Sequence, residues 1–331
     1  TTSGNGALTI DFNMQPQSTK TQYKVSLYNA DGKKLKNVTV KGELGSVENI
    51  FKNDILAETG TYYLVVESGD NGKGQQNGYY DFVVNDSYFP TASSNNDFKS
   101  AELVSLDAKG TGTSAENRWV GFGDATDYYK FTTDGNGAIT IDFNMQPQSA
   151  KTQYKVTLYD ATGKKLKNVT VKGELGSVEN IFKNEILALE GTYFLTVESG
   201  DKGKGQQNGY YDFVINDDYF PAASSNNSFG TAEQIALNAA GTGTSDKNQW
   251  VGFGDAADYF KFTTTENGAL SIDFNMQPQN AKTQYKVSLY DSAGKKLKNV
   301  TIKGELGSVE NIFKNDVLAV AGTYYLVVES G

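Results

Sequence analysis

Two pairs of aspartates stand three residues apart in nearly the same local sequence. Asp124 and Asp127 occur in WVGFGDATDYYKFTT, and Asp255 and Asp258 occur in WVGFGDAADYFKFTT. Neighbouring carboxylates are the residue types used for glycoside hydrolysis and for holding a hard cation such as calcium. Because enzymes rarely carry identical active sites in series, the repetition of the pair argues against catalysis. The simpler alternative is that Asp124 caps a turn and Asp127 is solvated.

The amino-acid composition excludes most other kinds of catalytic and metal site. The chain has no histidine and no cysteine, which excludes serine–histidine triads, thiol nucleophiles, disulfides and zinc sites built from these residues. Arg118 is the single arginine, so bidentate clamps for phosphate or carboxylate are nearly excluded. A net charge of −9 argues against nucleic acid and anionic membranes as partners, and no apolar run approaches the ~18 residues of a membrane span. We therefore expect no enzymatic activity.

The acidic pairs belong to a repeat that fills the chain. The segments NGALTIDFNMQPQS, NGAITIDFNMQPQS and NGALSIDFNMQPQN begin at Asn5, Asn136 and Asn267, which are 131 residues apart. The segment KGELGSVENIF occurs three times with the same period. A unit of this length is far longer than a solenoid repeat, so each unit is expected to be a domain.

The period divides the chain into three parts. We predict a partial unit at 1–90 that lacks its N-terminal part, a complete unit at 91–221, and a partial unit at 222–331 that lacks its C-terminal strands. The joint between the first two is expected at residues 85–96, NDSYFPTASSNN, which contain a proline, small polar residues and no periodicity. A chain divided in this way is expected to come from a longer protein with whole repeats.

Alternation of apolar and polar residues predicts strands in each unit. In the first unit it runs through ALTIDFNM, YKVSLY, LKNVTV, TYYLVVE and YYDFVV, which cover residues 7–14, 23–28, 35–40, 61–67 and 79–84. Short strands, frequent Gly-rich turns and very little helical pattern predict an all-β fold. The expected architecture is a series of tandem antiparallel β-sandwich domains, jelly-roll-like, with roughly eight strands per unit.

Two segments have less regular patterns. Residues 47–51, VENIF, fit one face of a short helix or a strand around a bulge, and their Gly-rich flanks favour a strand or an irregular segment. Residues 100–102, near the start of the complete unit, fit one helical turn. Aromatic side chains such as Phe12, Tyr62 and Phe143 are expected to supply much of the core.

Six segments of the complete unit follow one another in a specific order. They are NNDFKSAE (95–102), GDATDYYKF (123–131), AITIDF (138–143), YKVTLYDATGKKL (154–166), GTYFLTVESG (191–200) and GYYDFVI (209–215). This series resembles the bacterial pre-peptidase C-terminal domain, a family that includes the collagen-binding domains of clostridial collagenases. The resemblance covers one full unit and recurs over the two partial units. It implies a β-sandwich jelly roll that occurs on secreted proteases and as repeats in large surface proteins.

The resemblance also implies a calcium site where the segment before the domain folds back on it. The residues that it assigns to the metal, with nearby carbonyls, are Asn96, Asp97, Asp124 and Asp127 in the complete unit and Asp255 and Asp258 in the third. Ser228 stands where the third unit would have the equivalent of Asp97. Two linker glutamates that bind calcium in the collagenase members have no match in this sequence. Calcium is the expected cofactor.

Trp119 and Trp250 directly precede the acidic turns. An exposed tryptophan is a common platform for a sugar or a protein, so both are candidate ligand-binding residues. A tryptophan buried over the end of the sandwich is the alternative. Tyr88 and Phe89, at the junction, are expected to pack neighbouring units together.

Two functions fit these expectations. The first is a structural repeat module of a bacterial extracellular fibre, stalk or adhesin, stiffened by calcium at its joints, with neighbouring units and other copies in a filament as partners. The second is a binding module for an extracellular protein, collagen-like, or for a glycan, which acts by avidity. Near-identical units favour the first, because a unit that only folds and connects is freely duplicated. Both functions place the protein at the cell surface or in the medium.

Overall fold

A computed structural model describes residues 1–74, 76–315 and 317–331 of the protein. In these residues the chain forms 27 strands and no helix, in agreement with the alternating sequence pattern. A helix long and apolar enough to cross a membrane is accordingly not found among them.

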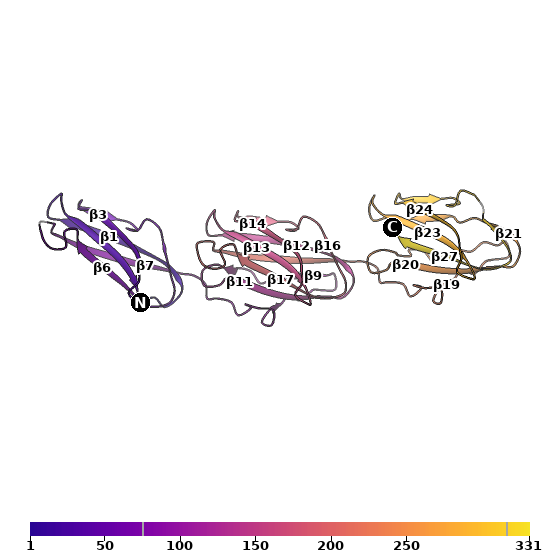
Figure 1. The fold of residues 1–331 in the computed structure, drawn as a ribbon, viewed down its shortest axis with the longest axis horizontal. Coiled ribbons are helices and arrows are strands. Elements are labelled where there is room, and N and C mark those ends of the chain that lie inside the picture. Colours follow the sequence, from indigo (N-terminus) through magenta and orange to yellow (C-terminus); the bar gives the residue numbers. More distant parts are fainter. Residues whose placement is uncertain (75, 316) are drawn as a thin grey trace. The chain divides into compact units, whose positions relative to one another are not determined.

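The strands form three sets of sheets, which we call the first, middle and third set (Figure 1). The first set consists of β1 (Gly6–Pro16), β2 (Gln22–Asn29), β3 (Lys34–Lys41), β4 (Gly45–Val47), β5 (Ile55–Ala57), β6 (Tyr62–Ser68) and β7 (Gly78–Tyr88). One sheet has the order β4-β1-β5, with β7 paired along the whole of β1, and the other has the order β3-β2-β6.

The middle set contains both sheets in their fullest form. Its strands are β8 (Glu102–Leu103), β9 (Thr111–Thr113), β10 (Arg118–Val120), β11 (Thr126–Thr133), β12 (Gly137–Pro147), β13 (Gln153–Asp160), β14 (Lys165–Lys172), β15 (Gly176–Val178), β16 (Ile186–Ala188), β17 (Gly191–Ser199) and β18 (Gly209–Tyr219). The six-stranded sheet runs β10-β18-β12-β15, with β9 on β18 and β16 on β12, and the five-stranded sheet runs β14-β13-β17-β11-β8.

The third set repeats this plan with fewer paired strands. Its strands are β19 (Glu233–Gln234), β20 (Ala257–Thr264), β21 (Gly268–Leu270), β22 (Phe274–Met276), β23 (Gln284–Asp291), β24 (Lys296–Lys303), β25 (Gly307–Val309), β26 (Val317–Ala319) and β27 (Gly322–Ser330). A five-stranded sheet has the order β19-β20-β27-β23-β24, and β21 pairs with β26 and β22 with β25. The pairs β8–β11 and β19–β20 are parallel, whereas the long pairs β1–β7, β13–β17 and β20–β27 are antiparallel.

Apolar side chains of both sheets meet between the layers of the middle set. Tyr129 on β11, Phe143 on β12, Tyr154 on β13 and Tyr211 on β18 all have no exposed surface. The Phe143 ring stacks on Tyr211 with centroids 5.5 Å apart and meets Tyr154 edge-on at 5.7 Å. Such aromatic pairs add to the free energy gained from burial alone. The predicted fold class, all-β with antiparallel sheets packed as sandwiches, is confirmed.

The structure shows which conformation is adopted by the segments whose sequence pattern was least regular. The segment 47–51 is irregular, because β4 ends at Val47 and a turn follows. The helical turn predicted near Glu102 is wrong, since this residue starts the short strand β8. The predicted joint at 85–96 begins within a strand, because β7 continues to Tyr88 and pairs with β1 over its full length.

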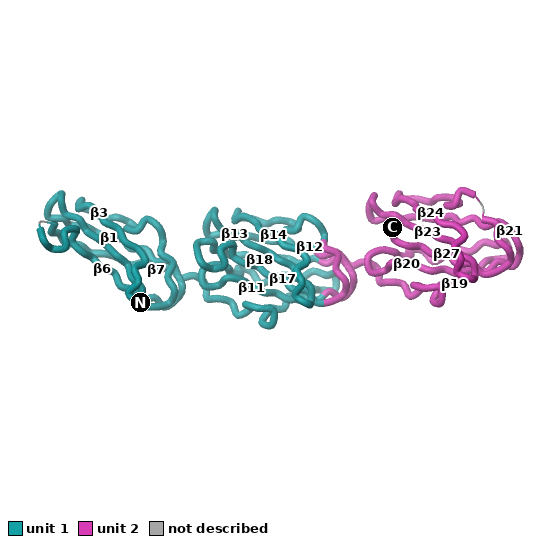
Figure 2. Tube along the Cα trace, in the orientation of Figure 1, with its two compact units in different colours: residues 1–132, 140–185, 192–216 teal, residues 133–139, 186–191, 217–331 magenta. Residues whose placement is uncertain are grey.

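The chain divides into two compact units by its internal packing (Figure 2). One comprises residues 1–132, 140–185 and 192–216, and the other comprises residues 133–139, 186–191 and 217–331. These limits differ from the domain limits at 90 and 221, which remain a prediction from the sequence repeat. Every contact of the acidic sites lies within one unit.

Candidate functional site

The acidic turn of the middle set is closed by backbone hydrogen bonds. The Gly121 amide donates to the Asp124 carbonyl at 2.7 Å, and the Asp124 amide donates to the Gly121 carbonyl at 3.0 Å. Gly123 lies between them with a φ of 85°, a left-handed conformation that glycine adopts at little cost. A Cβ on Gly123 would also lie 2.2 Å from Asn5 Nδ2, so the Asn5 side chain would have to move.

Asp127 lies on the core-facing side of β11. Along this strand Asp127, Tyr129 and Phe131 are buried and alternate with more exposed residues. Asp127 is 1% exposed and Asp124 is 3% exposed. Burial removes the water that would solvate the charges, and it raises the pKa of Asp127 to about 6 and also raises the pKa of Asp124. The structure therefore places two carboxylates together where charge is disfavoured.

Ser93, from the segment between β7 and β8, binds both carboxylates. Its amide donates to Asp124 Oδ2 at 2.7 Å, and its hydroxyl donates to Asp127 Oδ1 in a short hydrogen bond. The same segment is bonded to β11, because the Tyr128 amide donates to the Asn95 carbonyl at 2.8 Å and Asn95 Nδ2 donates to the Tyr128 carbonyl at 3.1 Å. The segment that precedes the middle set is thus fixed to the acidic pair.

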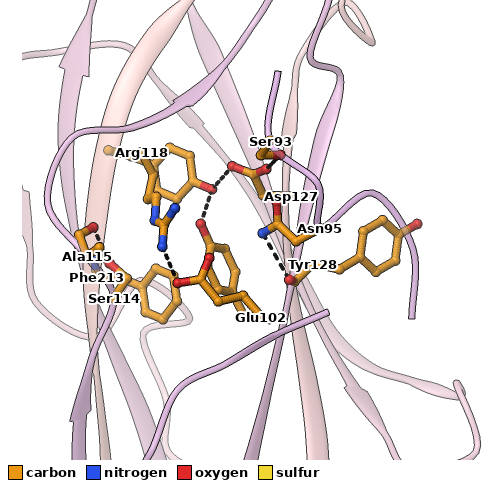
Figure 3. A network of polar contacts seen from close by, with 11 residues as sticks. Ser93, Asn95, Glu102, Ser114, Ala115, Arg118, Asp127, Tyr128 and Phe213 are labelled. Atoms are coloured by element: carbon orange, nitrogen blue, oxygen red, sulfur yellow. Dashed lines mark hydrogen bonds and ion pairs between the residues drawn. The ribbon is translucent and has the colours of Figure 1, made fainter. Parts of the chain in front are cut away.

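Two buried tyrosines extend the network around Asp127, which Figure 3 shows from close by. The Tyr211 hydroxyl donates to Asp127 Oδ2 in a short hydrogen bond, and the hydroxyls of Tyr129 and Tyr211 are 2.7 Å apart. Burial raises the pKa of both tyrosines above the ordinary value, so they stay protonated and act as hydrogen-bond donors at neutral pH. Hydrogen bonds from Ser93 and Tyr211 lower the pKa of Asp127, but the effect of burial is larger.

The single arginine lies beside this network (Figure 3). The Arg118 guanidinium forms a short ion pair with Glu102, and the two side chains are 27% and 34% exposed. Its charge lowers the pKa of Asp127 slightly, but its bonded partner is Glu102. In the part of the chain that the structure describes, no ion pair joins Asp124 or Asp127 to a lysine or arginine.

The third set repeats the turn and its serine. The Ser224 amide donates to Asp255 Oδ2 at 2.7 Å, and the Ser224 hydroxyl donates to Asp258 Oδ1 at 2.5 Å. Burial raises the pKa of Asp258 to about 6. Asp255 Oδ1 is buried and has no hydrogen-bond partner among the described residues. The pair of acids with one serine is therefore a unit that occurs at both joints.

The structure does not bring Asp97 to the acidic pair. The Asp97 carboxylate accepts hydrogen bonds from the amides of Lys99 and Ser100 at 2.8 Å and from the Ser100 hydroxyl at 2.9 Å, which lowers its pKa. It therefore caps an exposed turn. Among the residues described, no three acidic, histidine or cysteine side chains form a group that could hold a metal ion. The expected cluster of three carboxylates is corrected to the pair of Asp124 and Asp127.

The other residues at the expected site also form hydrogen bonds within the segment that precedes each set, and not with the acidic pair. Asn96 Nδ2 donates to the Ser93 carbonyl at 2.6 Å, and the equivalent Asn227 makes the same bond at 2.6 Å. Ser228, at the place of Asp97, forms the corresponding turn with Thr231, whose hydroxyl accepts from the Ser228 amide at 3.1 Å. A serine suffices at this place because a turn needs only a short polar side chain.

The two tryptophans pack the joints. Trp119 is 5% exposed, and its ring stacks on Phe89 at 5.4 Å and meets Tyr210 at 5.0 Å. Trp250 is half-buried and stacks on Phe220 at 5.5 Å. Of the two alternatives for the tryptophans, burial holds at Trp119, where the neighbouring rings cover the indole, and the exposed ligand platform does not. Phe89 thus makes a packing contact with Trp119, whereas Tyr88 is 55% exposed and its hydroxyl accepts a hydrogen bond from the Ser3 hydroxyl at 3.1 Å.

Sequence reasoning missed Ser93, Ser224 and Tyr211. The burial of Asp127 could have been predicted from the sequence. Asp127 lies two residues before Tyr129 and four before Phe131, so in a strand all three side chains face the core. Nothing in the local sequence distinguishes Ser93 from the other small polar residues of its segment.

The acidic pair fits a hard cation in the kind of donor that it offers. Buried charges in proteins are paired, protonated or bound to a metal, and in the described part of the chain neither carboxylate forms an ion pair with a lysine or arginine. The unpartnered Asp255 Oδ1 leaves an acceptor available at the second site. Calcium takes about six to eight oxygen ligands, so backbone carbonyls and water would have to supply those beyond the two carboxylates.

Comparison with known proteins identifies no family. No family model matches the chain, and no curated protein matches it. Among solved structures, the chain is similar to the pre-peptidase C-terminal domain of a collagenase from Bacillus anthracis, with 19% identity over 35% of this chain and 93% of that one and a TM-score of 0.25.

Two further solved structures are similar to the chain. The PBSX exported protein XepA has 9% identity over 76% of this chain and 90% of its own, with a TM-score of 0.24. The CUB1-EGF-CUB2 domains of rat MASP-1 have 10% identity over 69% and 95%, with a TM-score of 0.23. With identities and scores this low, none of these similarities supports a conclusion about ligand or activity. The fold and the site together define an all-β sandwich module with an acidic joint.

Proposed function

We propose that the chain is a structural repeat module of a bacterial extracellular fibre, stalk or adhesin, with calcium stiffening the joints between sandwiches. The observation that carries this proposal is the bonding of each joint segment by the acidic pair that follows it, Ser93 by Asp124 and Asp127 and Ser224 by Asp255 and Asp258. A spacer that must keep its length needs joints whose chain is fixed, since a free linker behaves as a flexible coil.

Aromatic packing supports the same role, because it fixes the start of each joint segment. The Phe89 amide donates to the Asn5 carbonyl at 2.8 Å while its ring stacks on Trp119. The second joint repeats this arrangement with Phe220, whose amide donates to the Asn136 carbonyl at 2.8 Å. Each segment is therefore bonded at its beginning by an aromatic residue and at its end by a serine.

In this proposal calcium would be held by the two carboxylates of each pair. Bound calcium would neutralise charges that burial disfavours, and it would bind the folded joint in preference to the unfolded chain. Ser93 orients the pair by donating one hydrogen bond to each carboxylate. Asp97 is not a ligand in this proposal, because its Oδ1 caps a separate exposed turn and is not brought to the acidic pair.

Thermal unfolding with and without calcium tests the proposal. Calcium added to a chelated sample should raise the midpoint, because a ligand at 100 times its Kd stabilises the folded state by about 2.7 kcal/mol. The double variant Asp127→Asn/Asp258→Asn should lose this shift, and Asp97→Ala should keep it. An unchanged midpoint of the natural chain in millimolar calcium would contradict the calcium site.

Small-angle scattering tests the stiffness separately. The maximum dimension of the chain should be larger and more sharply defined with calcium than with chelator. A maximum dimension that is the same with calcium and with chelator would contradict calcium stiffening. The joints would then be fixed by protein contacts alone.

The alternative function, a binding module for an extracellular protein or a glycan, has less support. It relied on an exposed aromatic platform beside the acidic turn, and the Trp119 ring is covered by Phe89 and Tyr210. For the same site we propose no catalytic role, because the acidic pair recurs in the middle and third sets and enzymes rarely carry identical active sites in series.

A further inference from the structure

Each set has one edge strand in which basic residues are concentrated. These strands are β3, β14 and β24, and with the residue before each they read KKLKNVTVK, KKLKNVTVK and KKLKNVTIK. We call the three segments, 33–41, 164–172 and 295–303, the lysine edges. Each contains four lysines and no acid, so 3 × 4 = 12 of the 30 basic residues lie in them. Without these lysines the rest of the chain has a net charge of −9 − 12 = −21, so the lysine edges are local cationic surfaces on an acidic protein.

Strand β14 lies at the edge of the five-stranded sheet of the middle set (Figure 1). Among the described strands it pairs with β13 alone, and likewise β3 pairs with β2 alone and β24 with β23 alone. The Gly173 amide donates to the Thr152 carbonyl at 2.6 Å, so the alternation of an antiparallel pair turns the amides of Asn168 and Thr170 away from β13. A lysine edge therefore offers backbone donors as well as ammonium groups.

The lysines of these edges are exposed and keep their charge. In the middle set all four are exposed, namely Lys164, Lys165, Lys167 and Lys172. In the part of the chain that the structure describes, none of the twelve forms an ion pair with an acid. Lys34 and Lys296 lie over tyrosine rings, with Nζ 5.4 Å and 5.3 Å from the ring centroids, a contact that orients an ammonium group without neutralising it.

Each lysine edge is one strand wide, which limits the anions that fit it. Neighbouring strands are about 4.8 Å apart, and charges are largely screened beyond about 8 Å at physiological salt. A membrane surface, or a DNA duplex with one charge per about 1.7 Å, extends past the lysines and meets the acidic remainder of the chain. A single thin polymer that lies along the edge stays close to the lysines and to the free amides.

We propose that each lysine edge binds a linear anionic polysaccharide, whose carboxylate or sulfate groups accept hydrogen bonds from the lysines and the free amides. Three such edges on one chain bind a long polymer with avidity. This inference goes beyond the proposed spacer role, and it involves neither the acidic pairs nor the tryptophans. Polysaccharide binding and calcium stiffening can therefore fail separately in the experiments.

Surface plasmon resonance tests the proposal with polygalacturonate and dextran sulfate on the surface and neutral dextran as the reference. Chelator in the buffer prevents calcium from bridging protein and polymer. The natural chain should bind at least one of the two anionic polymers and leave neutral dextran unbound. The polymer that is bound more tightly identifies the anionic group. Binding should weaken as salt is raised, because salt screens exposed charges.

The variant Lys36→Glu/Lys167→Glu/Lys298→Glu reverses one charge in each lysine edge. It should weaken binding to the anionic polymer at least about tenfold, because the loss at each edge is compounded by the loss of avidity. The rise in the unfolding midpoint on adding calcium should be the same in this variant as in the natural chain.

The matched control is Lys52→Glu/Lys183→Glu/Lys314→Glu, which changes the net charge by the same amount at three exposed lysines. Lys52 lies beside the other sheet, since the nearby Ile50 amide donates to the Ile10 carbonyl of β1 at 2.7 Å. The control should bind within about threefold of the natural chain, because charges that far from the polymer are screened. Circular dichroism verifies that both variants fold.

Three results would overturn the proposal. Equal losses in the two variants would show a general effect of net charge. Tighter binding of duplex DNA or anionic vesicles than of both polysaccharides would assign the lysine edges to another partner. Lysines on an edge strand also keep copies of a chain from pairing through their sheets. If that is their sole role, the natural chain will bind neither anionic polymer.

Discussion

The acidic pairs of the middle and third sets each bond to one serine, and they differ in the aromatic residues packed behind them. Asp127 and Asp258 are each 1% exposed, and each accepts a hydrogen bond from one serine hydroxyl. Asp127 also accepts from Tyr211, whose hydroxyl is bonded to that of Tyr129. In the third set Phe260 stands at the place of Tyr129 and has no hydroxyl.

The ionic surroundings differ as well. Arg118 forms an ion pair with Glu102, whereas the equivalent Gln249 donates a long hydrogen bond of 3.5 Å to Glu233. The pKa is nevertheless raised to about 6 in both Asp127 and its counterpart, with burial as the largest cause in each. The comparison shows that burial raises the pKa of both acids, although the polar groups around them differ.

Removal of the central acid should have the largest effect. Asp127→Ala leaves the buried hydroxyls of Ser93 and Tyr211 without an acceptor and should cost about 2–3 kcal/mol. Trp119 and Trp250 are the two tryptophans, so the fluorescence of Trp119 reports urea unfolding of the middle set when Trp250 is changed to phenylalanine. A loss below about 1 kcal/mol would contradict the role of these hydrogen bonds.

Acidification should affect the two sets alike. The folded-state pKa of Asp127 and Asp258 lies above the ordinary value of 3.8, so the folded state binds protons more tightly than the unfolded chain. Without calcium, lowering the pH from about 7.5 to about 5 should stabilise each set by about 1 kcal/mol, and this gain is lost as the pH rises through about 6. Asp127→Asn and Asp258→Asn should each flatten the profile of their own set. A natural chain with the same profile as the variants would show that the acids are not raised.

Exchange of the arginine should make the middle set resemble the third. Arg118→Gln removes a partly exposed ion pair with Glu102 and should cost about 0.5 kcal/mol, since such pairs contribute little in contact with water. The converse variant, Gln249→Arg, should gain a similar amount by pairing with Glu233. A loss above about 2 kcal/mol in Arg118→Gln would mean that the guanidinium supports the buried acids directly.

The smallest effect is expected at the residue that the family resemblance assigned to calcium. Asp97→Ser reproduces the residue of the third set at this turn and should change the free energy of unfolding by less than about 0.5 kcal/mol. The midpoint shift on adding calcium should also stay the same. Loss of that shift would restore Asp97 to the metal site.

The fold was predictable because its signals are local. The alternation in ALTIDFNM and YKVSLY fixes which side chains face the core, and the strands β1 and β2 cover these residues. The same rule, applied to Asp127, Tyr129 and Phe131, also indicates that an acid lies in the core. Strand β7 extended past the predicted limit because pairing with β1 continues through Tyr88, and pairing depends on a partner distant in sequence.

The site was less predictable because its members come together only in the folded sheets. Ser93 and Tyr211 are 118 residues apart and meet on the two oxygens of Asp127. The family resemblance grouped Asp97 with the pair, although Oδ1 of Asp97 accepts hydrogen bonds within its own turn. Competition between a local turn and a distant cluster is decided by backbone geometry, which residue types do not specify.

The bonds between the joint segment and β11 also bear on proteolysis. Residues 91–96, TASSNN, have the small polar composition at which proteases usually cut folded chains. Yet Asn95 is 4% exposed, and both its carbonyl and its side-chain amide are bonded to Tyr128. A protease must draw this segment away from the strand before it can cut. An array of such units in a protease-rich medium would therefore lose whole sandwiches at joints that have opened, while closed joints would leave the chain uncut.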